Sequence, residues 1–524
     1  MVKETAKKTK ESDSPVRGLW REQEGSTLEK LFKEQPVIQV SGELGNQVTQ
    51  ICINSRKVIP GSLFFAISGE LTNGNYFIEE AIDRGACAIV TEESPPQHCI
   101  IPHIQVDNVR ESLANISRRF HKDPDLQIKL TGVTGTNGKT TVTSLVKFIL
   151  DERGHSSGTA VLGTLHYDLG KRVIPSTRTT PEAHDICSML KLAHDEGCKR
   201  AMMEVSSHGV CQKRIHGLHF ETAVFLNLTP EHLDFHGSME SYYKAKRSFV
   251  VGEHAPEPKH VVVNLDDGYG KRLFHEIPEG ITKYGFGEDK EAHFRARHIN
   301  LGANHTDLQL EYPDGIIELK TPLIGRFNVQ NILASLAVGW IEGRDMHSLA
   351  ARLEMFTGSP GRMECVKEGQ DFNVFVDYAH TSDALRNILS VLREVTDGRL
   401  LLVFGCGGDR DQNKRPEMTH AAQEYCDFVW ATADNPRSEP LDSIFGHMKA
   451  GVQSPGRISF VKDRRRAIGL AIDQAQPSDC LVIAGKGHEA YQEFQNVVVP
   501  FDDRRVAREL LQLQKASGKE VLNA

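Results

Sequence analysis

Gly132-Val-Thr-Gly135-Thr-Asn-Gly138-Lys139-Thr140-Thr141 contains three glycines and ends in a Lys-Thr-Thr run. The apolar run Gln127–Val133 overlaps its start and predicts a strand. The apolar residues after it are spaced as on one face of a helix. Glycines let backbone N–H groups approach phosphate oxygens, and a helix N-terminus adds partial positive charge. The segment therefore predicts a phosphate-binding loop between a strand and a helix.

Two side chains of this loop have expected roles of their own. Lys139 would reach the β- and γ-phosphates of ATP, and the hydroxyl of Thr140 would ligate Mg²⁺. Five residues instead of the usual four separate Gly132 from Gly138. The alternative is a glycine-rich turn that binds nothing, and the Lys-Thr-Thr run disfavours it. The residues expected to contact ATP are Gly132, Val133, Thr134, Gly135, Thr136, Asn137, Gly138, Lys139, Thr140 and Thr141.

Strand and helix signals alternate along the rest of the chain. Apolar runs at Ala201–Val205, Ala223–Leu228 and His260–Asn264 predict strands after the loop, and Leu400–Gly405 and Cys480–Ala484 predict later ones. Strands that alternate with helices imply mostly parallel sheets covered on both faces. The predicted class is α/β, in three consecutive α/β domains.

Composition bounds the class of function. The 524 residues carry a formal charge of -8 and a pI near 6.3, which disfavours a nucleic-acid binder. The ten cysteines show no C-x-x-C spacing, as is usual for reduced thiols. No apolar run approaches the ~20 residues of a membrane span, and no signal peptide is evident. We expect a cytoplasmic protein without membrane insertion.

The loop sequence G-T-N-G-K-T-T resembles that of the Mur ligases and of their folylpolyglutamate synthase relatives, and further motifs match from about Leu28 onward. The resemblance implies a UDP-substrate-binding domain over 27–124, a central P-loop type ATP-binding domain over 125–356 and a C-terminal Rossmann-like, amino-acid-binding domain over 357–524. Residues 1–26 are charged and are expected to be a disordered extension. In this family ATP phosphorylates a carboxylate, and an amine attacks the acyl phosphate.

The resemblance also assigns catalytic residues and metal ligands. Glu204, in E-V-S-S-H, looks like a Mg²⁺ ligand, and His232 looks like a ligand of a second Mg²⁺. Lys246 stands where the family carries a carbamylated lysine, whose anionic oxygens suit a metal site. By spacing alone His232 and His236 could bind zinc, but a third ligand is not evident. The expected catalytic residues are Lys139, Glu204, His232 and Lys246, and the metal ligands are Thr140, Glu204, His232 and carbamylated Lys246.

The substrate contacts are likewise implied by matching motifs. Asn328, Asn331, Asp377 and His380 look like contacts to adenine and ribose. The carboxylate substrate would be UDP-MurNAc-L-Ala-D-Glu, and Asn54 stands where the family more often has Asp. The residues expected to contact this UDP-linked substrate are Ser55, Glu70, Leu71, Thr72, Thr179, Thr180, Ser206, Gln212 and Arg214.

The amino-acid substrate is indicated by three loops that follow predicted strands of the C-terminal region. The turn Asp434-Asn-Pro-Arg437 resembles that of the ligases that add meso-diaminopimelate. A buried Arg437 could bind the distal carboxylate of this amino acid through two hydrogen bonds, and Glu489 could hold the distal ammonium. The expected contacts are Arg410, Asp434, Asn435, Pro436, Arg437, Gly485 and Glu489.

Three rival functions stay open at this point. The chain could add L-lysine instead, or it could be a folylpolyglutamate synthase-like ligase. A protein of another class, a P-loop NTPase that couples hydrolysis to binding, should lack the C-terminal motifs. We expect a monomer whose partners are small-molecule substrates.

Overall fold

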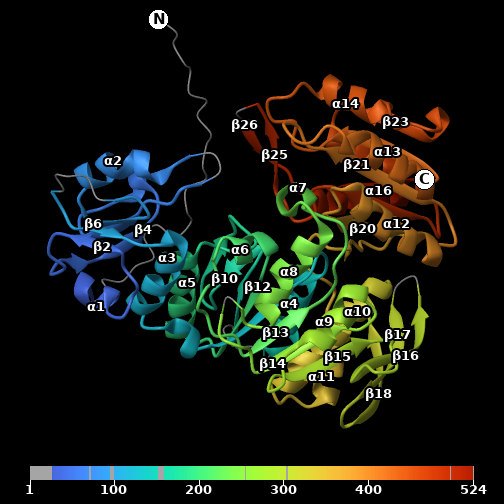
Figure 1. Ribbon diagram of the computed structural model, residues 1–524. Coiled ribbons are helices and arrows are strands. Elements are labelled where there is room, and N and C mark those ends of the chain that lie inside the picture. Colours follow the sequence, from blue (N-terminus) through green and yellow to red (C-terminus); the bar gives the residue numbers. More distant parts are fainter. Residues whose placement is uncertain are drawn as a thin grey trace, which may run out of the picture. The chain divides into compact units, whose positions relative to one another are not determined.

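The computed structural model describes residues 26–69, 72–94, 100–151, 158–253, 255–302, 305–495 and 497–522 (Figure 1). Residues 1–25 of the expected extension lie outside the described residues. The expected substrate contacts Glu70 and Leu71 do so as well. The chain forms two compact units. Unit 1 comprises Met1–Arg295 and Leu333–Asp345, and unit 2 comprises Ala296–Ile332 and Met346–Ala524.

Unit 1 begins with a five-stranded sheet in the order β2-β7-β6-β5-β4, parallel from β4 to β7. The elements are α1 (Leu28–Phe32), β2 (Gln39–Ser41), β4 (Gln50–Cys52), β5 (Ser62–Phe65), α2 (Ile78–Asp83), β6 (Ala86–Thr91), β7 (His103–Gln105) and α3 (Val109–Phe120).

The second sheet of unit 1 carries the predicted phosphate loop. The sheet has eleven strands, of which those lying wholly in unit 1 run in the order β11-β10-β9-β12-β8-β13-β14-β15, and β9, β12, β8, β13, β14 and β15 are parallel. The elements are β8 (Lys129–Thr134), α4 (Lys139–Leu150), β9 (Thr159–Leu162), β10 (His166–Asp168), β11 (Val173–Pro175), α5 (Ala183–Asp195), β12 (Arg200–Glu204), α6 (Ser207–Cys211), β13 (Thr222–Phe225), α7 (Leu233–His236), α8 (Met239–Val250), β14 (His260–Asn264), α9 (Gly268–Glu276) and β15 (Thr282–Gly287).

This order places the loop at a switch point of the sheet. The chain runs from β8 to strands on one side, β9 and β12, and later to β13 and β14 on the other. Ligands of open α/β sheets bind beyond the carboxyl ends of strands at such points. Gly132 is required by packing inside β8, because a Cβ there would lie 2.5 Å from the Phe249 ring. The predicted apolar face of α4 is buried, including Val142, Leu145 and Ile149.

Unit 2 contains a six-stranded sheet in the order β19-β20-β24-β21-β22-β23, in which only β19 is antiparallel. Apolar clusters line both of its faces, as expected for a doubly covered α/β sheet. Its elements are β19 (Glu364–Cys365), β20 (Asn373–Asp377), α12 (Ser382–Val395), β21 (Leu400–Cys406), α13 (Lys414–Tyr425), β22 (Phe428–Ala433), α14 (Leu441–Lys449), β23 (Ile458–Val461), α15 (Arg464–Gln474), β24 (Cys480–Ala484), β25 (Tyr491–Phe494), β26 (Val497–Pro500) and α16 (Asp503–Leu522).

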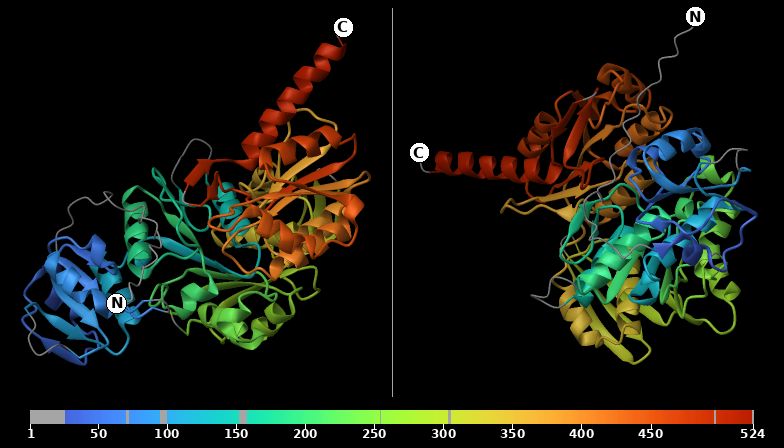
Figure 2. Two further views of the ribbon diagram at one scale, coloured as in Figure 1. Left: turned by 90° about the horizontal axis from the view of Figure 1, so that it is seen from above. Right: turned by 90° about the vertical axis from the view of Figure 1, so that its left-hand side faces the viewer.

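The remaining elements of unit 2 include the hairpin of β17 (Thr306–Tyr312) and β18 (Gly315–Thr321), and α11 (Met346–Leu353). Strand β16 (Phe294–Leu301) and helix α10 (Arg326–Ile341) each run across a boundary between the units. Figure 2 shows α16 extending outward from the sheet of unit 2. The predicted α/β class is confirmed, and the predicted domain boundaries stay predictions. Within the described residues, no helix is both long enough and apolar enough to cross a membrane.

Candidate active site

The phosphate loop is closed by Asn227, which follows β13. The backbone N–H of Asn137 donates to the Asn227 side-chain oxygen at 2.9 Å, and the Asn227 amide donates back to the Asn137 carbonyl at 3.1 Å. The N–H of Thr136 donates to the Asn227 carbonyl at 3.0 Å. Gly138 precedes α4 with φ +91°, a conformation that L-residues rarely adopt. The loop is therefore held in shape from two neighbouring strands.

Lys139 lies over this loop. Its Nζ donates to the carbonyls of Gly135 at 2.7 Å and Thr136 at 2.9 Å. The ammonium thus lies beside the backbone of the loop, and its contact with phosphate stays a prediction. A cation at this position can stabilise negative charge that develops during phosphoryl transfer.

Glu204 is a buried carboxylate at the end of β12, only 1% exposed. It accepts hydrogen bonds from the hydroxyl of Thr140 at 3.1 Å, and from the N–H and the hydroxyl of Thr164 at 2.8 and 3.0 Å. Gly163 makes room for it, because a Cβ there would lie 2.4 Å from the carboxylate. All three donors are neutral, so the buried charge still favours a cation. These oxygens have the chemistry that Mg²⁺ prefers.

Lys246 lies on α8 with its side chain buried. Its Nζ donates to the carbonyl of Gly135 at 2.8 Å and to the hydroxyl of Thr134 at 3.4 Å, and it lies 4.8 Å from the centre of the Tyr242 ring. Burial lowers the pKa of Lys246 well below its ordinary value, and the charge of Lys139 lowers it further. An uncharged amine beside the loop is the form that can take up CO₂.

The histidines after β13 have different surroundings. His232 has φ +55° and its ring packs edge-on against His208, with 4.8 Å between centroids. Burial lowers the pKa of His232, which favours the neutral, metal-binding form. His236 instead contacts the hydroxyl of Ser207 at 2.9 Å and stacks on Tyr242. The part of the chain that the structure describes holds no group of three or more His, Cys, Asp or Glu that could bind a metal ion.

Most of the described candidates for the UDP-substrate contacts lie around the end of β12. The hydroxyl of Thr180 donates to the Glu204 carbonyl at 2.8 Å and contacts the Ser206 hydroxyl at 3.1 Å. The buried Arg214 donates to the carbonyl of Thr180 at 2.8 Å and to the side chain of Gln212 at 2.5 Å.

The other candidates for these contacts divide into two groups. Thr179 contacts Thr164, with 3.2 Å between hydroxyls, and so belongs to the same region. Ser55 and Thr72 belong to the first sheet region, where Ser55 donates to Glu80 at 2.7 Å and Thr72 is exposed.

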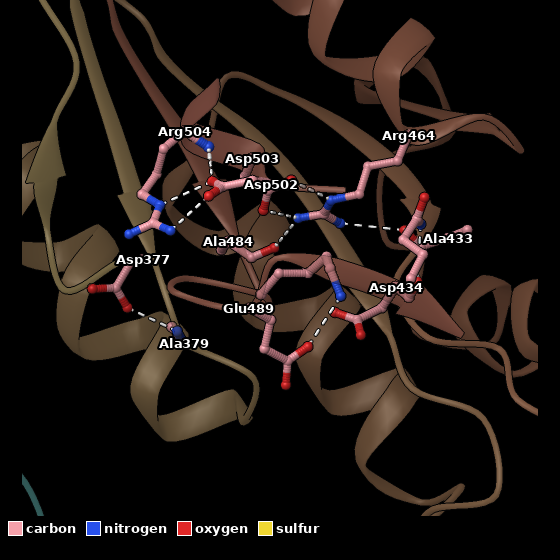
Figure 3. Close-up of polar contacts among 12 residues, drawn as sticks. Asp377, Ala379, Ala433, Asp434, Arg464, Ala484, Glu489, Asp502, Asp503 and Arg504 are labelled. Atoms are coloured by element: carbon pink, nitrogen blue, oxygen red, sulfur yellow. Dashed lines mark hydrogen bonds and ion pairs between the residues drawn. The ribbon is translucent and has the colours of Figure 1, made fainter. Parts of the chain in front are cut away.

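The candidates for adenine and ribose contacts lie in unit 2. Asn331 donates to the side chain of Asn328 at 3.1 Å, and both are buried. The carboxylate of Asp377 accepts from the N–H groups of Ala379 (Figure 3) and of Met363, both at 2.7 Å. Burial raises the pKa of Asp377. His380 is exposed after the same strand.

The loops after β22 and β24 meet at the carboxyl edge of the sheet in unit 2. The amide of Asn435 donates to Glu489 at 2.9 Å, so these two expected site residues are in contact. The buried Lys486 donates to the side-chain oxygens of Asn435 and Glu489, each at 3.0 Å. Gly485 has φ +111°, and a Cβ there would lie 2.8 Å from the Asp434 carboxylate. One oxygen of Glu489 thus has two donors, and the other is available to a ligand.

Arg437 departs from the buried position that the sequence argument assumes. Its side chain is 23% exposed, and Nε lies 3.3 Å from the Glu493 carboxylate. Another guanidinium nitrogen donates to the carbonyl of Gly408 at 2.8 Å. The turn pairs with β25, because the N–H of Arg437 donates to the Glu493 carbonyl. The last nitrogen remains for a ligand. Arg410, also expected here, is exposed.

Two charged residues of this region were missed by the sequence argument. Lys486 lies within the G-K-G-H-E segment that supplies Gly485 and Glu489, so its position was a usable signal. Arg415 is 1% exposed and makes two 2.6 Å contacts with Glu439, which joins the loop after β21 to the turn after β22. Nothing in its local sequence indicates that contact.

The fold and the loop define a nucleotide-binding α/β protein, and similarity to known proteins identifies the family. Residues 47–121, 133–339 and 361–487 match patterns described as Mur ligase family, catalytic domain; Mur ligase middle domain; and Mur ligase, glutamate ligase domain. A UDP-N-acetylmuramoyl-L-alanyl-D-glutamate--2,6-diaminopimelate ligase from Solibacter usitatus is 42% identical over 89% of this chain and 94% of its own. The chain therefore belongs to the Mur ligase family and is a ligase.

Solved structures agree with this placement. A structure of a UDP-N-acetylmuramoyl-L-alanyl-D-glutamate--2,6-diaminopimelate ligase is 31% identical, with a TM-score of 0.68, and covers 94% of this chain and 99% of its own. A Mycobacterium tuberculosis folylpolyglutamate synthase, solved with ADP and AMPPCP, is 19% identical, with a TM-score of 0.56 over 72% of this chain and 92% of its own. The second likeness concerns the fold alone.

Proposed function

We propose that the chain joins meso-2,6-diaminopimelate to UDP-MurNAc-L-Ala-D-Glu at the expense of ATP. The reaction forms an acyl phosphate and then an amide bond, releasing ADP and phosphate, in the synthesis of peptidoglycan precursors. The observation that carries the proposal is the grouping of Asn435, Arg437 and Glu489 at one sheet edge, in a chain 42% identical to a ligase named for diaminopimelate.

The loop would bind ATP, with Lys139 against its phosphates. Mg²⁺ would be held by Thr140 and Glu204, and a second ion by His232 and a carbamate on Lys246. The carboxylate of Glu204 is buried and accepts hydrogen bonds from neutral groups, so a cation beside it would balance its charge. When bound, the ions supply positive charge to the phosphates during transfer. The chain's own part is to position the two reactants and to hold Lys139 ready.

The carbamate is supported by the surroundings of Lys246. Its amine is fully enclosed, and it donates hydrogen bonds to two neutral oxygens, Thr134 Oγ1 and the carbonyl of Gly135. Among the described residues, an ammonium in this place would have no carboxylate within ion-pair distance. Joining the amine nitrogen to CO₂ releases one proton and leaves an anionic oxygen donor, which a neighbouring cation would stabilise.

The two distal groups of diaminopimelate account for the charges at the edge of the unit 2 sheet. Glu489 would accept from the distal ammonium with its available oxygen. Arg437 would donate to the distal carboxylate with the nitrogen that Glu493 and Gly408 leave unused. L-lysine has the distal ammonium but no distal carboxylate. It would therefore donate to Glu489 but offer no carboxylate to Arg437.

Membership of the family removes the NTPase that only couples hydrolysis to binding. An L-lysine-adding ligase would use an amino acid that lacks the distal carboxylate of diaminopimelate. A folylpolyglutamate synthase-like ligase would phosphorylate the carboxylate of a folate instead of that of the UDP-linked substrate. We place the reaction in the cytoplasm, where ATP is available, and we expect a monomer.

The test is phosphate release under omission of each component. Release should require ATP, Mg²⁺, UDP-MurNAc-L-Ala-D-Glu and meso-diaminopimelate together. L-lysine and glutamate are tested as alternative amines and a folate as an alternative acid, and none of them should support comparable release. Release with a folate and glutamate, or release that needs no acid substrate, would refute the proposal.

A further inference from the structure

Arg464 is an arginine with a side chain wholly shielded from solvent, at the first turn of α15 in unit 2. Its guanidinium binds the carboxylate of Asp503 through two hydrogen bonds, both 2.7 Å. Asp503 is equally buried and begins α16. Such a pair is costly to bury and persists only where its remaining donors are also satisfied.

The remaining donors of Arg464 reach two different strands. One nitrogen donates to the carbonyl of Ala433 at 3.3 Å, and another to the carbonyl of Ala484 at 2.9 Å (Figure 3). Ala433 ends β22 and Ala484 ends β24, and these strands are not neighbours, because β21 lies between them. The guanidinium therefore spans the end of the central strand and joins its two flanking strands.

The two carbonyls directly precede the loops of the candidate amino-acid site. Asp434, which starts the Asp-Asn-Pro-Arg turn, follows Ala433, and Gly485, which starts the Gly-Lys-Gly-His-Glu loop, follows Ala484. The Asn435–Glu489 hydrogen bond of 2.9 Å crosses between the same two loops. Their separation is thus set at the base by Arg464 and at the tip by the site residues themselves.

We propose that Arg464 is a positioning residue for the amino-acid substrate, anchored by Asp503 and acting through the strand ends that carry the two binding loops. The proposal rests on the proposed function, since those loops bind the amino acid there. Only arginine fits the task, because a planar fork serves one carboxylate and two carbonyls, whereas a lysine has three donors on a single nitrogen. Displacements of ~1 Å in a substrate site can cost as much as 10²-fold in rate.

The opposite edge of the same sheet supplies a matched control. Arg399 also binds an aspartate through two nitrogens, with contacts of 3.2 and 2.7 Å to Asp479, and it donates to the carbonyl of Gln474. Asp479 directly precedes β24 and Arg399 directly precedes β21, so this pair lies at the amino ends of the strands. A purely structural arginine–aspartate pair should behave like this one.

The experiment compares Arg464→Lys with Arg399→Lys in the full chain, using the amino acid that the wild type accepts. We expect Arg464→Lys to raise KM for the amino acid at least about tenfold, with KM for ATP and for the UDP substrate within about twofold. The rise in melting temperature on adding the amino acid should shrink in the same variant. Arg399→Lys should lower the melting temperature of the protein without changing the KM for the amino acid.

Contrary outcomes are equally definite. An equal rise in all three KM values, or the same KM change in Arg399→Lys, would make Arg464 a structural residue only. If Arg464→Lys is insoluble, Asp503→Asn carries the test, because it keeps the guanidinium and weakens its anchor. That variant should raise the amino-acid KM alone, and an unchanged KM would overturn the proposal. A wild type that ignores diaminopimelate would refute the proposed substrate, not this role.

Discussion

The hydroxyl of Thr140 and the carboxylate of Glu204 lie 3.1 Å apart, so the first turn of α4 and the end of β12 share a hydrogen bond. Both groups offer the oxygen donors that Mg²⁺ prefers, and they would hold such an ion together. Thr164 holds the Glu204 carboxylate in this orientation from the loop after β9.

Glu204→Gln should weaken the enzyme's use of Mg²⁺. The change keeps the hydrogen bonds in part but removes the anionic ligand. Even loss of a group that only supports a metal ligand costs about 10- to 100-fold in metal affinity, and loss of the ligand itself should cost at least as much. Titrating phosphate release with Mg²⁺ measures the effect. An unchanged Mg²⁺ dependence would remove Glu204 from the metal site.

Lys246→Ala should abolish most ligation, and short carboxylates such as acetate or formate should restore part of it. Removal of the buried amine removes the carbamate and leaves space where a small anion can bind near the metal. Lys244→Ala is the control, because Lys244 lies on the same helix with an exposed side chain. Normal turnover by Lys246→Ala would mean that no carbamate is needed.

Lys139→Ala should reduce turnover by about 10²- to 10³-fold, the usual effect of removing one preorganised group that stabilises transition-state charge. Its ammonium donates to the loop carbonyls of Gly135 and Thr136, which are neutral acceptors, so we expect the fold to survive. Single-turnover kinetics would measure the chemical step, and circular dichroism would check the fold. Full turnover would refute the role of the loop.

Glu439→Gln should destabilise unit 2 by about 2–3 kcal/mol at neutral pH, because the buried Arg415 loses its carboxylate. The hydrogen bonds from Arg415 lower the pKa of Glu439 to about 2 from its ordinary 4.5. A lowered pKa stabilises the fold fully above pH 4.5, and that gain is lost as pH falls toward 2. Denaturant unfolding at several pH values should therefore show the two proteins converging in acid. A constant difference would contradict the assignment.

The sequence predicted those parts that local patterns determine. The strand, loop and helix around Lys139 follow from apolar spacing and from glycines, and all were confirmed. The strands before Asp434 and Gly485 were likewise predicted from short apolar runs. What it could not predict are contacts between distant residues, such as Arg464 with Asp503, 39 positions apart. The prediction that Arg437 is buried was wrong for the same reason. Its partner Glu493 lies in a hairpin much later in the chain.

Arg437→Ala should raise KM for diaminopimelate by about 10- to 100-fold while leaving KM for ATP nearly unchanged. The distal carboxylate would lose a charged hydrogen-bond partner, an interaction worth ~1–3 kcal/mol or more. The variant should lower the ratio of kcat/KM for diaminopimelate to kcat/KM for L-lysine. The ratio falls because activity with diaminopimelate drops, without a gain of good activity with L-lysine. Steady-state kinetics with both amino acids test this. Unchanged selectivity would mean that this turn does not select the amino acid.

The most direct test of the central claim is a competition in one vessel. The wild-type protein receives ATP, Mg²⁺, UDP-MurNAc-L-Ala-D-Glu and equal concentrations of meso-diaminopimelate and L-lysine, and mass spectrometry measures the two tripeptide products. We predict the diaminopimelate product in excess by at least about a hundredfold, because L-lysine leaves Arg437 without a carboxylate from the substrate. Comparable amounts of the two products, or a predominance of the lysine product, would contradict the account.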